Sequence, residues 1–247
     1  MDFRSFKLAI AVLCLVCIHP VAAPAVEFRS VTFGGKRAMV CCVDLKKDQL
    51  GLFLNDNSGR TLKSFAALAH WLEMQNKRLI FAMNAGMFEP DYSPVGLFIS
   101  SGRQLTPVNL KAGVGNFYLK PNGVFAITQS GALIVDSSQY QAIPGPVILA
   151  TQSGPLLVSN GVIHPALQPG SPSRLLRNGV GVAAPDKVFF VISEDPVNLY
   201  EFAALFRDGL HCPNALFLDG TVSSLYAPSL GRNDRKTDLG PMIGVVQ

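Results

Sequence analysis

Four short polar clusters interrupt otherwise apolar stretches of the sequence, at residues 83–88, 150–155, 174–181 and 218–224. They contain two Asn, two Arg, an Asp and several Ser and Thr hydroxyls beside Gly-containing turns. Such groups need partners, because an unpaired buried polar group costs about 1–3 kcal/mol. Taken singly, each cluster fits a turn whose side chains cap the backbone. Taken together, they predict a site for an anionic, oxygen-rich substrate, since Arg and exposed turn N–H groups both bind phosphate.

The signatures of several common enzyme classes are absent from the sequence. It contains no GxSxG, SxxK, HExxH or GxxxxGK[ST] pattern, and no CxxC pair occurs after the N-terminal segment. Beyond the N-terminal segment, His70, His164 and His211 are not spaced to share a metal ion, and the carboxylates are scattered. The sequence therefore predicts neither a metal site nor a cofactor. Any chemistry must rest on carboxylates, amides, Arg and backbone N–H groups.

At these clusters the sequence resembles the phosphodiester glycosidase family, and more closely the exported bacterial branch of that family. The family motifs are of the types Asn-Gly-Gly-x-Phe, Arg-Thr-x-x-Gly and Asp-Gly-Gly-x-Ser. They fall in this order on residues 84–88, on Arg177, Asn178 and Gly181, and on residues 219–223. The resemblance covers most of the chain, from Phe81 to Val245. Two departures stand out, because Ala85 and Thr221 each occupy a position where the family has Gly.

The resemblance implies a hydrolase that cleaves between the anomeric carbon of a sugar and a phosphodiester oxygen, giving free sugar and a phosphomonoester. An oxocarbenium-like transition state needs a carboxylate near the anomeric carbon and donors on the departing phosphate. Asp219 is expected to supply the carboxylate, as base or electrostatic stabiliser, and Arg177 to clamp the phosphate. Asn84 is expected to orient sugar hydroxyls or the attacking water, as is Ser153. The expected substrate-binding residues are Gly86, Ser153, Gly154, Asn178, Gly220 and Ser223.

Two predictions have alternatives: the identity of the second carboxylate of the reaction, and the function of the protein. Glu194 and Asp195 are either that carboxylate or solvated loop charges. A hydrolase of ordinary phosphodiesters or glycosides could use the same residues in other roles. A non-catalytic envelope protein that binds a glycan or sugar phosphate is the alternative that Ala85 and Thr221 favour.

Two helix–strand units are predicted to position the first and last clusters. Apolar residues at helical spacing predict a helix over residues 62–75, followed by a buried strand at 79–83. Near the C-terminus, Asn198 and Glu201 form a capping-box pattern, Gly209 ends the second helix, and residues 215–218 form a second buried strand. Each unit ends in a polar residue before a Gly turn, so both strands are expected to deliver polar groups to one sheet edge.

The remaining sequence predicts strands and hairpins. Residues 27–54 show short strands with a turn at Gly34-Gly35, and residues 55–59 read as a tight turn. Residues 95–192 are rich in β-branched and aromatic residues, and Asn-Gly pairs at 122–123, 160–161 and 178–179 indicate hairpins. We therefore expect an α+β fold with one large mixed, mostly antiparallel sheet and two main helices packed on it. Residues 26–247 are expected to form one domain.

The N-terminus has the pattern of an export signal. Arg4 and Lys7 precede an apolar run at residues 8–18, and small residues follow at 21–25. Residues 1–25 are expected to be a cleaved signal peptide, because the run is too short to span a bilayer as an anchor. The mature protein is then exported, to the periplasm or outside the cell, without a stable membrane span. The formal charge of +4 is small and dispersed, which argues against nucleic acid as a partner.

Three cysteines remain after the N-terminal segment: Cys41, Cys42 and Cys212. Export permits a disulfide. Neighbouring residues on a strand point to opposite faces, so only one of the first two could meet Cys212. The alternative is three free thiols, and the sequence does not choose between them.

Overall fold

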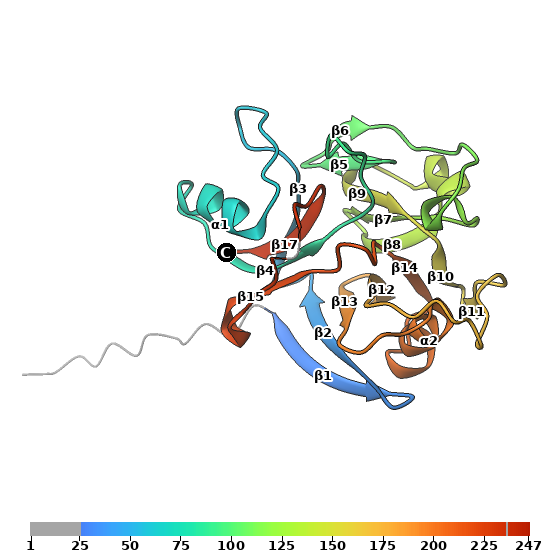
Figure 1. Ribbon diagram of the computed structural model, residues 1–247. Coiled ribbons are helices and arrows are strands. Elements are labelled where there is room, and N and C mark those ends of the chain that lie inside the picture. The colour runs from blue at the N-terminus through green and yellow to red at the C-terminus, as the bar shows by residue number, and fades with distance from the viewer. Residues whose placement is uncertain (1–25, 236) are drawn as a thin grey trace, which may run out of the picture.

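Antiparallel strands dominate the computed structural model, which describes residues 26–235 and 237–247 (Figure 1). The predicted signal peptide therefore lies outside the described residues. The strands are β1 (Glu27–Phe33), β2 (Lys36–Asp44), β3 (Gln49–Phe53), β4 (Leu79–Asn84), β5 (Phe98–Ser100), β6 (Arg103–Thr106), β7 (Gly123–Thr128), β8 (Gly131–Asp136), β9 (Val147–Ser153), β10 (Leu156–Ser159), β11 (Val162–Ile163), β12 (Asn178–Ala184), β13 (Lys187–Ser193), β14 (Asn214–Phe217), β15 (Leu225–Ala227), β16 (Arg232–Asn233) and β17 (Met242–Val246). The α-helices are α1 (Phe65–Glu73) and α2 (Leu199–Ala204).

The described strands form three sheets rather than the single large sheet expected from the sequence. Their orders are β1-β2-β13-β12-β14-β10-β11, β16-β15-β4-β17-β3 and β6-β5-β9-β7-β8. Every ladder between these strands is antiparallel. Strongly twisted open sheets rarely exceed about 10 strands, so a chain with this many strands divides them among several sheets.

One aromatic side chain from each sheet meets at the centre of the protein. Phe81 of β4 lies 5.4 Å from Phe190 of β13, and Phe125 of β7 lies 6.0 Å from the same ring, measured between ring centroids. All three rings are fully buried within the largest apolar cluster, which draws residues from all three sheets. Because each sheet turns one face toward this common core, strand ends from different sheets are brought together around it.

The two predicted helices are present and each covers an outer face. Ser64 caps α1, and Phe65, Leu68 and Leu72 of that helix are buried against the sheet that contains β4. Asn198 and Glu201 form the predicted capping box at the start of α2, and a π-helical turn continues this helix to Gly209. Phe202 and Phe206 of this segment pack on the seven-stranded sheet. The helices therefore pack on the outer faces of the sheets, and the polar clusters lie at the strands rather than on the helices.

Two of the three Asn-Gly predictions are corrected. Asn160-Gly161 does connect β10 to β11 in a hairpin. Gly123 instead opens β7 and Asn178 opens β12, so neither pair lies in a hairpin turn. Both asparagines are buried, and their side chains hydrogen-bond to other segments. The Asn-Gly pair therefore does not mark a turn at these two positions.

The three cysteines among the described residues are free thiols. Cys41 and Cys42 lie on β2, and neither forms a disulfide with Cys212. Cys41 packs in the central core, whereas Cys212 packs beneath α2, and burial raises the pKa of both thiols. Among the described residues, no helix is long and apolar enough to cross a membrane.

Candidate active site

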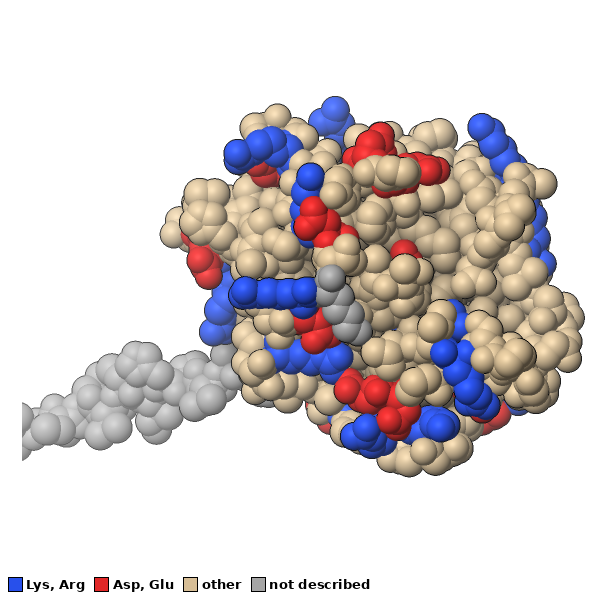
Figure 2. Space-filling view, in the orientation of Figure 1, with Lys and Arg blue, Asp and Glu red and all other residues tan. Residues whose placement is uncertain are grey.

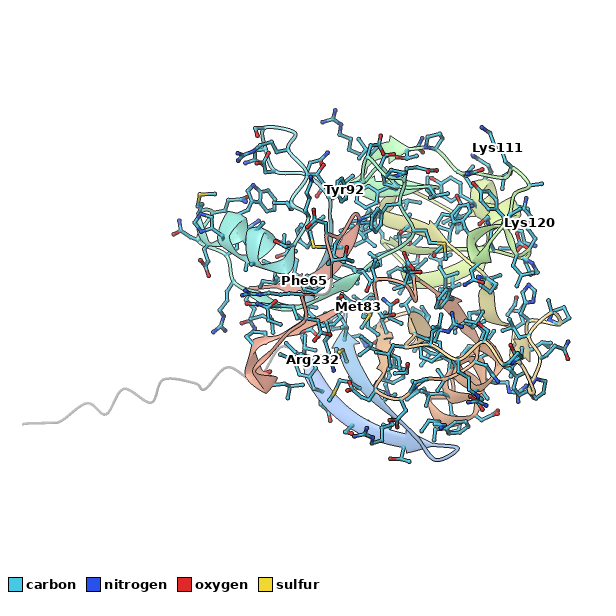
Figure 3. The ribbon with its side chains drawn as sticks, viewed as in Figure 1. Phe65, Met83, Tyr92, Lys111, Lys120 and Arg232 are labelled. Atoms are coloured by element: carbon cyan, nitrogen blue, oxygen red, sulfur yellow. The ribbon has the colours of Figure 1, made fainter. Side chains whose placement is uncertain are left out.

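The ends of three strands place the predicted residues at one junction between two sheets. Asn84 is the last residue of β4, Asn178 is the first of β12, and Asp219 follows β14 by two residues. β12 and β14 are neighbours in the seven-stranded sheet, and the Leu218 N–H donates to the Asn178 carbonyl over 3.1 Å. Both helix–strand units thus deliver their terminal polar residue to the same place, as the sequence predicts. In Figure 3 the labelled Met83, which precedes Asn84, marks the position of this junction in the middle of the molecule.

Asn84 and Asn178 bind each other through their side chains. The Asn178 Nδ2 donates to the carbonyl and to the Oδ1 of Asn84, each over 3.0 Å, and the Asn84 Nδ2 donates back to the Asn178 Oδ1 over 3.3 Å. The Asn84 Nδ2 also donates to the Asp219 carbonyl, and its Oδ1 accepts from the Ser224 N–H. An amide side chain offers two donors and two acceptor sites. Protein partners therefore occupy the whole hydrogen-bonding capacity of the Asn84 side chain.

The peptide groups of Asp219 are held on both sides, while its carboxylate forms no ion pair with a described residue. Its N–H donates to the Asn178 Oδ1 over 3.1 Å, and its carbonyl accepts from Asn84 and from the Ser223 hydroxyl. The carboxylate accepts the Thr221 N–H over 2.9 Å. Burial raises the pKa of Asp219, although the hydrogen bonds from residues 221 and 222 oppose this shift. Because the residue keeps some exposure, the carboxylate can reach a molecule bound from solvent.

Arg177 is a buried cation that forms no ion pair within the described residues. It is 2% exposed, and its Nη2 donates to the carbonyl and hydroxyl of Ser173. Its Cζ lies 5.5 Å from the centroid of the Phe217 ring. Burial lowers the pKa of Arg177, and no nearby carboxylate opposes that shift. An unpaired charge away from water is unfavourable, so this guanidinium is suited to an anion that comes from outside the chain.

Gly220 allows the cation and the loop of Asp219 to approach each other. A Cβ at this position would lie 3.2 Å from the Arg177 Nη1 and 3.1 Å from the Phe217 ring. Any larger residue would therefore press on the guanidinium. Ser223 closes the same loop, because its hydroxyl donates to the Asp219 carbonyl over 3.1 Å. Figure 2 shows that the central part of this face is formed mostly by residues other than Lys, Arg, Asp and Glu.

The other predicted binding residues form a supporting layer from the third sheet. Ser153 is completely buried and its hydroxyl donates to the Leu218 carbonyl. A Cβ at Gly86 would lie 2.9 Å from the Thr151 Oγ1, so this glycine permits close packing of β9. Gly154 packs instead against Asn122 and the Phe117 carbonyl. The structure thus brings six predicted residues together and places Gly86, Ser153 and Gly154 behind or beside them.

Glu194 and Asp195 both form ion pairs. Asp195 pairs with Arg37 over 2.9 Å, and this partner lowers the pKa of Asp195 to about 2. Glu194 pairs with Arg232, which also binds Asp234 over 3.0 Å. Figure 3 labels Arg232, which lies on β16 next to β15. These contacts support the interpretation of both acids as loop charges rather than as a second catalytic carboxylate.

The surroundings of Arg177 include residues that the sequence analysis did not identify. Ser173 and the Val197 carbonyl accept its hydrogen bonds, and Phe217 lies under its guanidinium. None of the three stands in a motif, and only the contact itself reveals them. Among the described residues, no group of three or more His, Cys, Asp or Glu is arranged to hold a metal ion.

Comparisons of the sequence with known proteins find a family and one related protein. The sequence model of the phosphodiester glycosidase family matches residues 77–245. YigE of Escherichia coli, an uncharacterized protein, is 38% identical over 145 residues, which are 59% of this chain and 57% of YigE. The chain therefore matches little more than half the length of this relative.

Two solved structures share the fold at low identity. The first is the catalytic domain of zebrafish N-acetylglucosamine-1-phosphodiester α-N-acetylglucosaminidase, auto-inhibited by its pro-peptide, with a TM-score of 0.64 and 15% identity over 91% of this chain and 84% of that one. The second is a Burkholderia pseudomallei protein predicted to be exported, with a TM-score of 0.55 and 13% identity over 85% and 74%. The family match covers more than half of the chain and includes Asn84, Arg177 and Asp219, so this protein belongs to the phosphodiester glycosidase family.

Proposed function

We propose that this protein hydrolyses sugar-1-phosphodiesters, releasing a free sugar and a phosphomonoester. The observation that carries the proposal is the buried Arg177, which has no acidic partner among the described residues and lies against the loop of Asp219. The family match supports the same chemistry at the level of the reaction class. A phosphodiester provides the anion that pairs with Arg177. Its sugar provides the anomeric carbon whose positive charge the Asp219 carboxylate stabilises.

Arg177 is the residue we assign to the phosphate. Its Nη1 lies beside Gly220 and donates no hydrogen bond to a described residue, whereas its Nε and Nη2 are held by the protein. One edge of the guanidinium is thus held by the protein, and the other, next to Gly220, makes no hydrogen bond with a described residue. As the bond from the anomeric carbon to the phosphate oxygen breaks, negative charge grows on that oxygen, and a fixed cation stabilises it there.

We assign Asp219 two roles: stabilising the positive charge at the anomeric carbon and accepting a proton from the attacking water. Water forms the new bond to the anomeric carbon, the electron pair of the old bond leaves with the phosphate, and the water loses a proton. A carboxylate stabilises the positive charge of the transition state and can accept that proton. Burial raises the pKa of Asp219, which makes it a stronger base than a solvated carboxylate.

Asn84, Asn178 and Ser153 are better suited to positioning than to binding the sugar. The two amides hold the N–H and the carbonyl of Asp219, and Ser153 holds the carbonyl of Leu218. All three side chains are buried and engaged by the protein. We therefore propose that they fix the Asp219 loop, which revises the sequence-based roles of Asn84, Asn178 and Ser153.

The proposal also includes export of the protein and catalytic turnover, and each rests on its own observation. Export rests on the N-terminal pattern of Arg4, Lys7 and the apolar run at residues 8–18. The alternative function is binding of a sugar phosphate without turnover. Thr221 favours it, because this residue replaces a family Gly and adds a side chain that hydrogen-bonds to the Asp219 carboxylate.

A substrate screen separates these functions. Purified protein is incubated with sugar-1-phosphodiesters, ordinary phosphodiesters and neutral glycosides, with and without a chelator, and free sugar and released alcohol are quantified. The proposal expects free sugar from the first class only. Alcohol without free sugar would identify a phosphodiesterase instead. Saturable calorimetric binding of the sugar phosphate without any product would establish the non-catalytic alternative.

A further inference from the structure

A groove of about 650 Å³ lies away from the candidate active site. Its walls come from β3, α1, β5 and the first residues of β9. In Figure 1, β3 stands between α1 on one side and β5 and β6 on the other. This volume falls within the range of about 300–1,000 Å³ that is typical of small-molecule sites.

The groove and the candidate active site lie at opposite ends of the same strands. On β9, Leu149 lines the groove, whereas Ser153 contacts the loop of Asp219. On β17, Val246 lines the groove, whereas Met242 pairs with Asn84. Four residues of a strand span about 13 Å, so a ligand in one site does not occupy the other.

One wall of the groove is aromatic and apolar. Trp71 of α1 is half-buried, lies edge-on to Phe53 with 6.2 Å between ring centroids, and its indole N–H donates no hydrogen bond to a described residue. Leu105 and Ile148 also line the groove and are 51% and 43% exposed. The result is an uncovered apolar surface with a single polar handle, which suits the C–H face and hydroxyl edge of a sugar ring.

Amide and hydroxyl groups also line the groove. Gln49, Asn57, Gln75 and Ser101 all line the groove. The Gln75 Nε2 donates to the Trp71 carbonyl over 2.9 Å, which ties this amide to the aromatic wall. Amides both donate and accept hydrogen bonds, as sugar hydroxyls do. The lining therefore matches a polyhydroxylated ligand better than a purely apolar one.

The charge of the groove is positive. Its only acidic residue, Asp56, accepts hydrogen bonds from Ser58 and from Arg60, whose guanidinium also forms an ion pair with it at 2.9 Å. These contacts lower the pKa of Asp56 and neutralise its charge. Lys77 and Arg103 line the same groove, are exposed, and form no ion pair with a described residue. The groove is complementary to an anion.

We propose that this groove binds a phosphorylated oligosaccharide, with Trp71 against a sugar ring and with Lys77 and Arg103 toward the phosphate. The choice of phosphate over another anion rests on the proposed function, because a phosphoglycan processed at Asp219 would carry the same groups. The site is then a second contact for a long substrate, distinct from the catalytic one.

Trp71 is the single tryptophan of the chain, so intrinsic tryptophan fluorescence reports on this groove alone. The full chain is titrated with maltotriose, with maltotriose 6-phosphate and with inorganic phosphate, and calorimetry measures the same affinities. We expect a saturable fluorescence change with the phosphorylated trisaccharide. Removing both cations, by Lys77→Gln with Arg103→Gln, is expected to raise its Kd by about 10- to 100-fold. The Kd for unphosphorylated maltotriose is expected to change little.

Arg78→Gln is the matched control, because Arg78 donates to the Gln247 Oε1 over 2.8 Å and does not line the groove. This variant is expected to bind like the original protein. The Lys77 and Arg103 variants are also expected to turn over a small sugar-1-phosphodiester at the original rate.

Three outcomes overturn the proposal: no fluorescence change and no calorimetric binding, equal affinity for phosphorylated and unphosphorylated trisaccharide, or binding that Asp219→Asn weakens and the groove variants do not. The last would place the ligand at the catalytic site. Failure of the proposed function gives a different pattern, in which phosphate-dependent binding near Trp71 persists but no free sugar is released from any diester.

Discussion

Two arginines of this protein are largely shielded from solvent but differ in whether they form ion pairs. The side chain of Arg232 is 23% exposed and pairs with two carboxylates, those of Glu194 and Asp234. Arg177 is more deeply buried, yet no acidic side chain in the described part of the chain pairs with it. Folded proteins pair a buried charge because it has lost its hydration. The difference indicates that Arg232 holds the structure together, whereas Arg177 is kept for an external anion.

The acids of the two regions differ in the same way. Asp234 binds Arg232 and accepts the Leu225 N–H, so it ties β16 to β15. Among the described residues, the carboxylate of Asp219 receives hydrogen bonds from Thr221 and Val222 of its own loop and from no cation, and burial raises its pKa. The region of Arg232 and Asp234 pairs its charges within the chain. In the region of Arg177 and Asp219, a cation and an anion lie close together without forming an ion pair.

The largest effect is expected from Asp219→Asn. Losing the carboxylate should reduce turnover of a sugar-1-phosphodiester by about 100- to 10,000-fold, because general acid–base and electrostatic assistance contribute on that scale. The Tm should not fall, since a neutral amide avoids burying a charge. Steady-state rates and thermal unfolding measure both effects. Asp234→Asn, the matched change in the paired region, should lower the Tm and leave turnover nearly intact, and the reverse pattern would refute the contrast.

The second effect is expected from Arg177→Met. Removing a fixed donor from a developing negative charge should reduce turnover by about 100- to 1,000-fold. The Tm should stay the same or rise, because Met fills similar space without an unpaired charge. The counterpart Arg232→Met leaves two carboxylates unpaired, and calorimetry should show a loss of about 1–2 kcal/mol in the free energy of unfolding. Full turnover by Arg177→Met would remove this residue from the mechanism.

A smaller effect on the rate is expected from Asn178→Ala, which removes the support of the Asp219 loop. The lost hydrogen bonds should cost about 1–3 kcal/mol of unfolding free energy. Displacement of the carboxylate should lower kcat by about 10- to 100-fold while KM changes little. Asn233→Ala, at an exposed position of β16, is the control and should alter neither quantity. An unchanged kcat in a destabilised Asn178→Ala protein would show that the residue is structural only.

The smallest effect is a shift in pH dependence. Burial raises the pKa of Asp219 above its ordinary value of 3.8, and the ionised form is the active one in this mechanism. Activity should therefore fall as the pH decreases through that raised pKa, so the acid limb should lie above pH 3.8. Between the ordinary and the raised pKa the folded state binds more protons than the unfolded state, so the stability from Asp219 decreases as pH rises. A kcat/KM profile and pH-dependent unfolding of Asp219→Asn test both signs.

The local elements of the fold could be predicted from the sequence, but their assembly could not. The capping box of Asn198 and Glu201 and the spacing of Phe65, Leu68 and Leu72 are local signals, and both helices are present. Division of the strands into three sheets depends on long-range pairings such as β4 with β17, which no local pattern encodes. Asn178 shows the same limit, since its amide binds Asn84, 94 residues away, rather than forming a turn.

The site could be predicted as a set of residues, but not as a set of roles. Motifs and strand ends were enough to predict that Asn84, Arg177 and Asp219 lie together. They could not show that the amide of Asn84 is fully engaged, nor that Arg177 lies over Phe217, because both depend on contacts between segments far apart in sequence. The distinction between a paired and an unpaired arginine appears only in three dimensions.

The most direct test of the central claim is hydrolysis of a sugar-1-phosphodiester in heavy-oxygen water, followed by mass spectrometry of both products. If Arg177 holds the phosphate as a leaving group and Asp219 serves the anomeric carbon, the label enters the free sugar and none enters the phosphomonoester. Label in the phosphate would show attack at phosphorus and would contradict the roles assigned to both residues.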